Sequence, residues 1–187
     1  MDISTYETQF DDILEGRNTL PPYDDEEYIH YVKMNKTRSS RLTRKGKLLP
    51  KLEEVIKSID KKMHWLLITE PWCGDAAHCH PFISRYAALN DHISLVIQNR
   101  DAPNSEIDKY LTNGGKSIPM LIVRDAAHQD LFTWGPRPKA AQEMYLDLKG
   151  RSIAWPDILK ELQLWYNKDK GVTMQEELYS LFKSHLT

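Results

Sequence analysis

The spacing of apolar residues along the chain predicts an alternation of amphipathic helices and short buried strands. In the helical segments, apolar side chains recur every three or four residues, which places them on one face. These segments are residues 3–15, 26–36, 48–60, a stretch after residue 73 that ends near residue 90, 105–112, 138–148, 156–166 and 174–185. Short apolar runs predict strands at residues 63–69, 92–99, 120–124 and 131–134.

The order of these segments predicts an α/β fold. Strands that are separated by helices need crossover connections and imply a parallel pair, whereas the short turn at residues 125–130 implies an antiparallel pair. The sequence Asn113-Gly114-Gly115 is expected to end the helix at residues 105–112. Thr173 and Glu176 have the spacing of a capping box, so they predict the start of the last helix.

Composition and charge narrow the class of protein. The chain has 187 residues, of which 41% are hydrophobic and 28% charged, and its formal net charge is -2. These values suit one globular domain with helical additions. Residues 33–52 carry eight Lys or Arg and no acid, but the bases are scattered and acidic residues 24–27 precede them. We interpret this run as a solvated helix face and predict no nucleic-acid partner.

Neither a leader nor a membrane segment is recognisable in the sequence. The first residues are acidic and lack the basic and apolar regions of a signal peptide. No apolar run approaches the roughly 20 residues that span a bilayer. We therefore expect a cytoplasmic protein without a membrane partner. In that reducing compartment its two cysteines favour redox chemistry, metal binding or core packing over a structural disulfide.

Residues 66–81 hold both cysteines and carry a family resemblance. An apolar strand runs directly into Trp72-Cys73-Gly74, and Pro81 follows eight residues after Cys73. Farther along, Ser117-Ile118-Pro119 precedes another apolar strand. With the order of helices and strands, these features resemble thioredoxin over about residues 61–150. The resemblance implies a thioredoxin-like fold, in which helices flank a central mixed sheet.

The resemblance also implies a domain organisation and a binding groove. Residues 61–150 would form the thioredoxin-like domain, with a helical extension at 1–60 packed on it and further helices at 151–187. In the family, the proline that corresponds to Pro119 is cis and faces the active cysteine, and the backbone beside it pairs with extended peptides. The groove would be bounded by four residues, namely Trp72, Gly74, Ile118 and Trp134. Both tryptophans fit core positions equally well.

The sequence departs from the dithiol pattern of the family at two positions. Thioredoxin has Cys-Gly-Pro-Cys, whereas this chain has Cys73-Gly74-Asp75-Ala76 and so lacks the second cysteine. The family also carries a buried Asp six residues before its first cysteine, where this chain has Leu67. The motif Trp-Cys-Gly-Asp, together with the sequence Trp-Gly-Pro-Arg-Pro at residues 134–138, is similar to that of an atypical bacterial branch of the superfamily.

Cys73 is the candidate nucleophile, and two charged residues are candidates for tuning its pKa. It lies where a strand passes into a helix, and the free N–H groups there favour a thiolate. Asp75 would cap the helix but repel a thiolate, and each effect is on the order of a kcal/mol. Arg137, in the loop after the fourth strand, could neutralise Asp75. The sequence leaves open both a reactive Cys73 and an inert thiol inherited with the fold.

Cys79 is the candidate resolving thiol. If the helix begins at Cys73, Cys79 lies about 9 Å farther along the helix axis and points to a different side of the helix. A disulfide needs Cα atoms within roughly 7 Å of each other. The alternative is a small residue packed under the sheet. His78 and His80 flank Cys79, but adjacent helix residues diverge and do not converge readily on one ion. We therefore predict no metal site and no cofactor.

The function we predict is that of a single-cysteine redox protein in thiol–disulfide exchange, with a binding module as the alternative and a third, weaker option. Cys73 could act as a single nucleophile that forms a mixed disulfide with glutathione or a protein thiol, which an external thiol then resolves. It could instead stay protonated in a non-catalytic module that binds a peptide or protein in the groove. The third alternative is a metal or cluster carrier built on Cys73. The pKa of Cys73 separates the first two functions.

Overall fold

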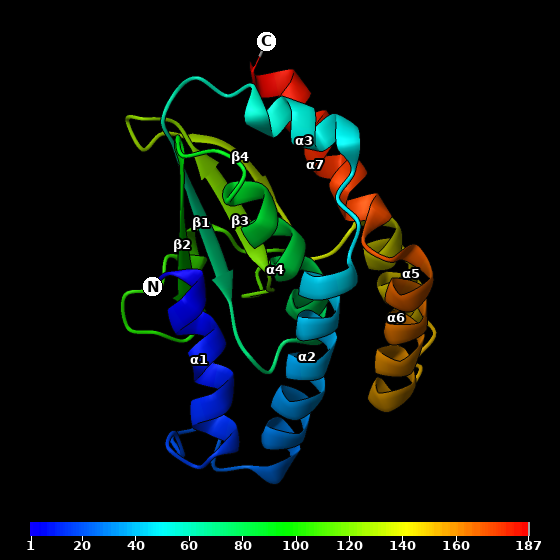
Figure 1. Cartoon of the computed structure of the whole chain (residues 1–187). Coiled ribbons are helices and arrows are strands. Elements are labelled where there is room, and N and C mark those ends of the chain that lie inside the picture. Colours follow the sequence, from blue (N-terminus) through cyan, green and yellow to red (C-terminus); the bar gives the residue numbers. More distant parts are fainter. Residues whose placement is uncertain (187) are drawn as a thin grey trace.

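The computed structural model describes residues 1–186 and contains a mixed sheet of four strands in the order β2-β1-β3-β4 (Figure 1). The strands are β1 (Met63–Thr69), β2 (Ile93–Asn99), β3 (Met120–Arg124) and β4 (Asp130–Trp134). The helices are α1 (Ile3–Leu14), α2 (Glu26–Lys45), α3 (Pro50–Lys57), α4 (Gly74–Ala87), α5 (Lys139–Gly150), α6 (Trp155–Asp169) and α7 (Val172–Leu186). The α/β class predicted from the sequence is confirmed.

Strand pairing places β1 in the centre of the sheet. β1 and β2 run parallel with Met63 opposite Ile93, and α4 supplies the crossover that a parallel pair needs. β3 is antiparallel to β1, and β4 returns antiparallel to β3. Four residues, 70–73, connect β1 to α4, so this turn lies where the central strand β1 ends and the helix begins.

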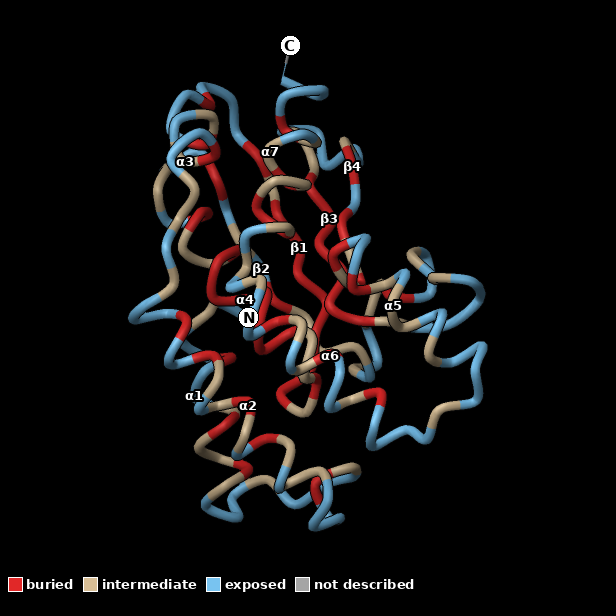
Figure 2. The backbone as a smooth tube through the Cα atoms, turned by 90° about the vertical axis from the view of Figure 1, so that its right-hand side faces the viewer, coloured by how far each residue is buried: buried red, intermediate tan, exposed pale blue. Residues whose placement is uncertain are grey.

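Alternate residues of β1 supply two hydrophobic layers, as the period of a strand requires. Trp65 and Leu67 belong to the larger layer, which also contains Phe82 of α4 and Phe182 of α7. Leu66 and Ile68 face the other way, into a smaller layer that also contains Cys73. Figure 2 shows the strands as a largely buried centre, while most of the exposed backbone lies on the helices and loops around it.

The first two helices pack side by side and extend the fold beyond the sheet (Figure 1). Asp25 accepts a hydrogen bond from the backbone N–H of Glu27 and so caps α2. α2 then continues to Lys45, beyond residue 36 where the sequence pattern places its end, and packs along α4. No helix in residues 1–186 is long and apolar enough to cross a bilayer.

Two local predictions are wrong. The helix expected at residues 105–112 is reduced to one 3-10 turn, Ile107–Lys109, because the next residues turn back and Thr112 pairs with Gly115. This connection makes no helical crossover, and β3 runs antiparallel to β1. The capping box is also absent, since α7 already begins at Val172 and the Thr173 hydroxyl donates to Asp169.

Candidate functional site

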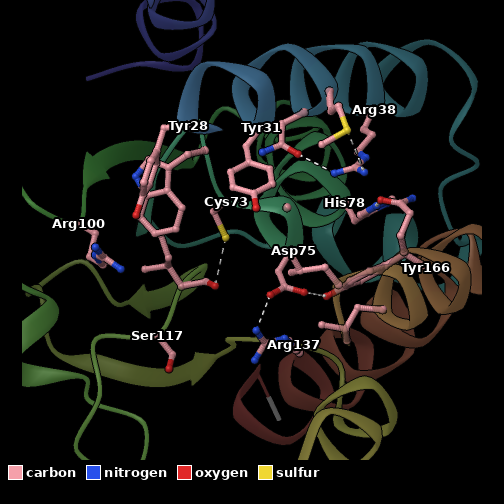
Figure 3. Close-up of a pocket in the computed structure, with 18 of the residues that line it drawn as sticks. Tyr28, Tyr31, Arg38, Cys73, Asp75, His78, Arg100, Ser117, Arg137 and Tyr166 are labelled. Atoms are coloured by element: carbon pink, nitrogen blue, oxygen red, sulfur yellow. Dashed lines mark hydrogen bonds and ion pairs between the residues drawn. The ribbon is translucent and has the colours of Figure 1, made fainter. Parts of the chain in front are cut away.

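A cavity of about 410 Å³ lies at the start of α4, in front of Cys73 (Figure 3). Its floor is the turn from β1 into α4, including Trp72, Cys73 and Gly74, and the segment 116–118 lies beside it. One wall is the face of α2 between Tyr28 and Arg38, and another is α6 between Trp155 and Tyr166. The two helices line this space on two sides and leave it partly open.

The Cys73 side chain caps α4 and is only 6% exposed. Its Sγ donates to the Ile118 carbonyl at 3.4 Å and accepts from the Ala76 N–H at 3.4 Å. Burial and the negative charge of Asp75 raise the pKa of Cys73 to about 12, although the Ala76 N–H and Arg137 act in the opposite direction. A pKa raised in this way favours the thiol over the thiolate at neutral pH, and the thiol is the form that can donate to the Ile118 carbonyl.

Asp75 and Arg137 form the ion pair suggested by the sequence. Nη2 of Arg137 lies 2.7 Å from Oδ2 of Asp75, and the Tyr166 hydroxyl donates to Oδ1 at 2.9 Å. Burial nevertheless raises the pKa of Asp75 against the effect of these two partners. Arg137 also donates to Gln142 and lies over the ring of Tyr145, so both ends of the pair are fixed.

The peptide bond between Ile118 and Pro119 is cis, as the resemblance implies. Ile118 lines the cavity and presents its carbonyl to the Cys73 Sγ. Pro119 lies behind it, and its own carbonyl packs against the backbone of Gly135. β3 begins its pairing with β1 only at Met120, so the backbone at Ile118 is outside the ladder.

The two tryptophans that were expected to border the groove have different environments. Trp72 lines the cavity, where the Tyr28 ring meets it edge to face at 5.8 Å and the Arg100 guanidinium lies 4.7 Å from the centre of its ring. Trp134 is buried elsewhere, and its Nε1 donates to Glu177 at 2.7 Å. The structure therefore brings Trp72, Gly74 and Ile118 together but does not bring Trp134 to the cavity.

Cys79 lies on the core side of α4, away from the cavity. Both cysteines are free, and Cys79 belongs to the larger hydrophobic layer whereas Cys73 belongs to the smaller one. This placement fits the packing alternative for Cys79, and the role of a resolving thiol has no support in the geometry.

His78 and His80 are both buried, so neither is a surface residue. His78 stacks on Tyr166 and bonds Gln163, and His80 meets the edge of the Tyr6 ring. Within residues 1–186, no group of three or more His, Cys, Asp or Glu side chains is arranged to hold a metal ion.

The contribution of α2 to the site is not among the predictions from the sequence. Tyr28, Tyr31, Asn35 and Arg38 are spaced by three and four residues, so they share one face of the helix, and all four line the cavity. The spacing was a usable signal, but the run of basic residues led us to interpret this face as solvated. Tyr166 of α6 also lines the cavity, and the sequence predicts for it only a place in a helix.

A buried acid was also missed. Glu70 is 4% exposed and accepts hydrogen bonds from Tyr23, Asn99 and the backbone N–H of Asp101. Burial raises its pKa. Position 67, where thioredoxins carry their buried acid, holds a fully buried leucine instead. Glu70 ties the end of β1 to neighbouring segments, and it lines a second cavity, separate from that of Cys73.

Comparison with known proteins gave matches of two kinds. A family model described as thioredoxin matches residues 22–152. Among solved structures, the chain resembles a protein of unknown function from Pseudomonas aeruginosa, with a TM-score of 0.59 and 16% identity over 81% of this chain and 85% of that one. It also resembles an HIV epitope-scaffold, with a TM-score of 0.56 and 17% identity over 98% and 99% of the two chains. These likenesses show a shared fold. None of the curated proteins compared with the chain matches it.

Proposed function

Because the chain belongs to the thioredoxin family, we propose that it uses the family's binding site as a ligand pocket in which Cys73 is a protonated wall residue. The ligand would be a peptide or protein segment, or a small molecule, held between the start of α4, the Ile118 backbone and the enclosing helices. A shared fold alone does not establish an activity, so the proposal rests on the site itself.

The observation that carries this proposal is the hydrogen bond from the Cys73 Sγ to the Ile118 carbonyl in a partly enclosed cavity. A thiol that donates to a carbonyl must keep its proton, whereas the nucleophile of thiol exchange is the thiolate. The chain has Ala76 where a dithiol enzyme has its second cysteine, and Leu67 where it has a buried acid. Both features support binding over dithiol catalysis.

The proposal is tested by the rate at which iodoacetamide alkylates Cys73 as a function of pH. A Cys79→Ala variant leaves one thiol to follow, and a Cys73→Ala variant gives the background. We expect slow alkylation at pH 7 and a midpoint above pH 8.5. A midpoint near or below 7 would show a thiolate at neutral pH and would overturn the proposal.

Thiol–disulfide exchange is the second candidate, and the Ala76 N–H directed at the Cys73 Sγ is the observation that favours it. In this reaction the Cys73 thiolate attacks one sulfur of a disulfide and forms a mixed disulfide. The other sulfur leaves as a thiolate, and an external thiol such as glutathione regenerates Cys73. Incubation with glutathione disulfide, followed by mass spectrometry and an insulin-reduction assay, tests it. A glutathionyl adduct on Cys73 with turnover would favour exchange. The cytoplasmic location expected from the sequence, which would supply glutathione, stays a prediction.

A further inference from the structure

The lining of the Cys73 cavity carries more positive than negative side chains. Four basic residues reach it, namely Arg38, Arg100, Lys116 and Arg137, and Asp75 is the acidic residue of the described lining. Such a lining attracts anions and disfavours cations, because opposite charges interact more strongly in a partly enclosed site than in bulk water.

Arg38 is the basic residue of this lining for which the described part of the chain provides no carboxylate. Each of the other three has one: Arg137 pairs with Asp75, Arg100 with Asp101 and Lys116 with Asp108. The Arg38 guanidinium donates instead to the Asn35 side-chain oxygen at 2.9 Å and to the Met34 sulfur at 3.9 Å. Partial burial and the nearby charge of Arg41 lower the pKa of Arg38. Keeping this guanidinium charged therefore costs free energy, which a bound anion would offset.

The position of the Arg38 guanidinium is fixed by a buried neighbour. Asn35 is 1% exposed, and its amide nitrogen donates to the Pro71 carbonyl at 3.0 Å, which leaves its oxygen directed at Arg38. Figure 3 shows Arg38 extending from α2 toward the start of α4. There Gly74 has no side chain, and a Cβ atom at that position would lie 3.7 Å from Nη1 of Arg38. The cation is therefore oriented before any ligand binds, which lowers the entropic cost of binding.

Aromatic rings line the same cavity nearer the start of α2, and Tyr31 lies between Tyr28 and Arg38 along this face of the helix (Figure 3). Tyr28 meets Trp72 edge to face at 5.8 Å and Tyr31 at 6.3 Å, and all three rings line the cavity. Rings of this kind contact the flat or apolar body of a ligand. We propose that the cavity binds an oxyanion ligand, in which a carboxylate or phosphate pairs with Arg38 and an attached planar or apolar body extends along α2 toward Tyr31, Tyr28 and Trp72. This inference rests on the proposed binding function and specifies the chemistry of the ligand.

The inference is tested by titrating the whole chain with four probes that share a phenyl ring and differ in charge. The probes are benzoate, phenyl phosphate, benzamide and benzylammonium. Binding of each is measured by the change in the backbone amide NMR shifts of Gly74 and Ser117. We expect benzoate or phenyl phosphate to bind at least tenfold more tightly than benzamide, and more weakly as salt is raised. The two anions separate a carboxylate from a phosphate ligand.

Three variants on α2 show whether Arg38 is the residue responsible. Arg38→Gln should weaken binding of the preferred anion at least tenfold, Arg38→Lys should restore part of it, and Arg44→Gln, which lies outside the cavity lining, should leave it unchanged. The inference would be overturned if benzamide bound as tightly as the anions or if benzylammonium bound more tightly than they do. It would also be overturned if Arg38→Gln bound the preferred anion like the wild type, or if neither anion bound at 20-fold excess over about 1 mM protein. Equal binding of benzamide and the anions would leave the proposed binding function intact. That function would instead be overturned by an alkylation midpoint of Cys73 near or below pH 7.

Discussion

Asp75 and Arg137 form an ion pair in the wall of the Cys73 cavity, with 2.7 Å between Oδ2 and Nη2, and their side chains are 11% and 12% exposed. The two residues are 62 positions apart in the sequence, so the pair joins the start of α4 to the loop after β4. Both also act on the pKa of Cys73, and they act in opposite directions. The pair therefore connects the stability of the fold with the chemistry of the thiol.

Asp75→Asn is expected to lower the pKa of Cys73. The Asp75 carboxylate is, after burial, the largest cause that raises this pKa, and the substitution removes its charge while it keeps its shape. Arg137 would then act on the thiol without a neutralising partner. The measurement is the midpoint of Cys73 alkylation against pH in a Cys79→Ala background. The matched control is Asp147→Asn, because Asp147 pairs with Arg151 on an exposed surface. The same midpoint in the Asp75 and Asp147 variants would contradict the prediction.

Arg137→Ala is expected to have the opposite effect on the thiol and to destabilise the fold. Loss of the Arg137 charge removes one of the interactions that lower the pKa of Cys73, so alkylation at pH 9 should slow. Removal of one partner of a nearly buried pair typically costs about 3–5 kcal/mol of unfolding free energy, and the Tyr166 hydroxyl bond to Asp75 favours the lower end.

Urea denaturation at pH 7 measures this cost. The control variant is Arg151→Ala, since Arg151 and its partner Asp147 are both 63% exposed and such a pair is typically worth less than about 1 kcal/mol. If the two arginine variants lose similar stability, the Asp75–Arg137 pair is not the structural link that we describe.

The sheet and the start of α4 could be predicted from sequence because their signals are local. β1 and β3 have the bounds expected from apolar runs, at residues 63–69 and 120–124. The enclosure of the cavity could not be predicted in this way. It depends on how α2 and α6 pack beside α4, and neither helix carries a motif that specifies its neighbour. Trp134 shows the same limit, because its hydrogen bond to Glu177 of α7 decides its environment.

His80→Phe is expected to make the fold less sensitive to acid. His80 is 1% exposed, the described chain offers no hydrogen-bond partner to either ring nitrogen, and burial lowers the pKa of His80 to about 3. Between that pKa and about 6.5, the unfolded chain binds a proton at this residue and the folded chain does not. The unfolding free energy therefore falls by about 1.4 kcal/mol for each pH unit below 6.5.

Urea denaturation of both proteins at several values between pH 4 and 7 checks this slope. The ring of His80 lies against Tyr6 and Phe10, so phenylalanine keeps the aromatic contacts. We expect the stability difference between variant and wild type to grow in favour of the variant as the pH falls from 6.5. A difference that is constant with pH would mean that His80 takes up a proton in the folded state as readily as in the unfolded one.

Gly135→Ala is expected to be among the most damaging small substitutions in the chain. Gly135 has a φ of 136°, which side chains rarely adopt, and a Cβ atom there would lie 2.2 Å from the Pro119 carbonyl oxygen. That oxygen belongs to the backbone behind Ile118, so it cannot move aside without shifting the wall of the cavity. Strain and clash together should cost more than about 3 kcal/mol of unfolding free energy.

Gly150→Ala is the matched control for that substitution, since a Cβ atom at Gly150 meets nothing within 4 Å and its φ lies outside the positive region. Alanine there replaces the last residue of α5 and should be neutral or stabilise the protein by up to about 1 kcal/mol. The midpoint of thermal unfolding separates the two variants, and the alkylation rate of Cys73 reports on the cavity. If Gly135→Ala folds with wild-type stability and an unchanged rate, the close approach of Gly135 to Pro119 does not position the Ile118 carbonyl against the thiol.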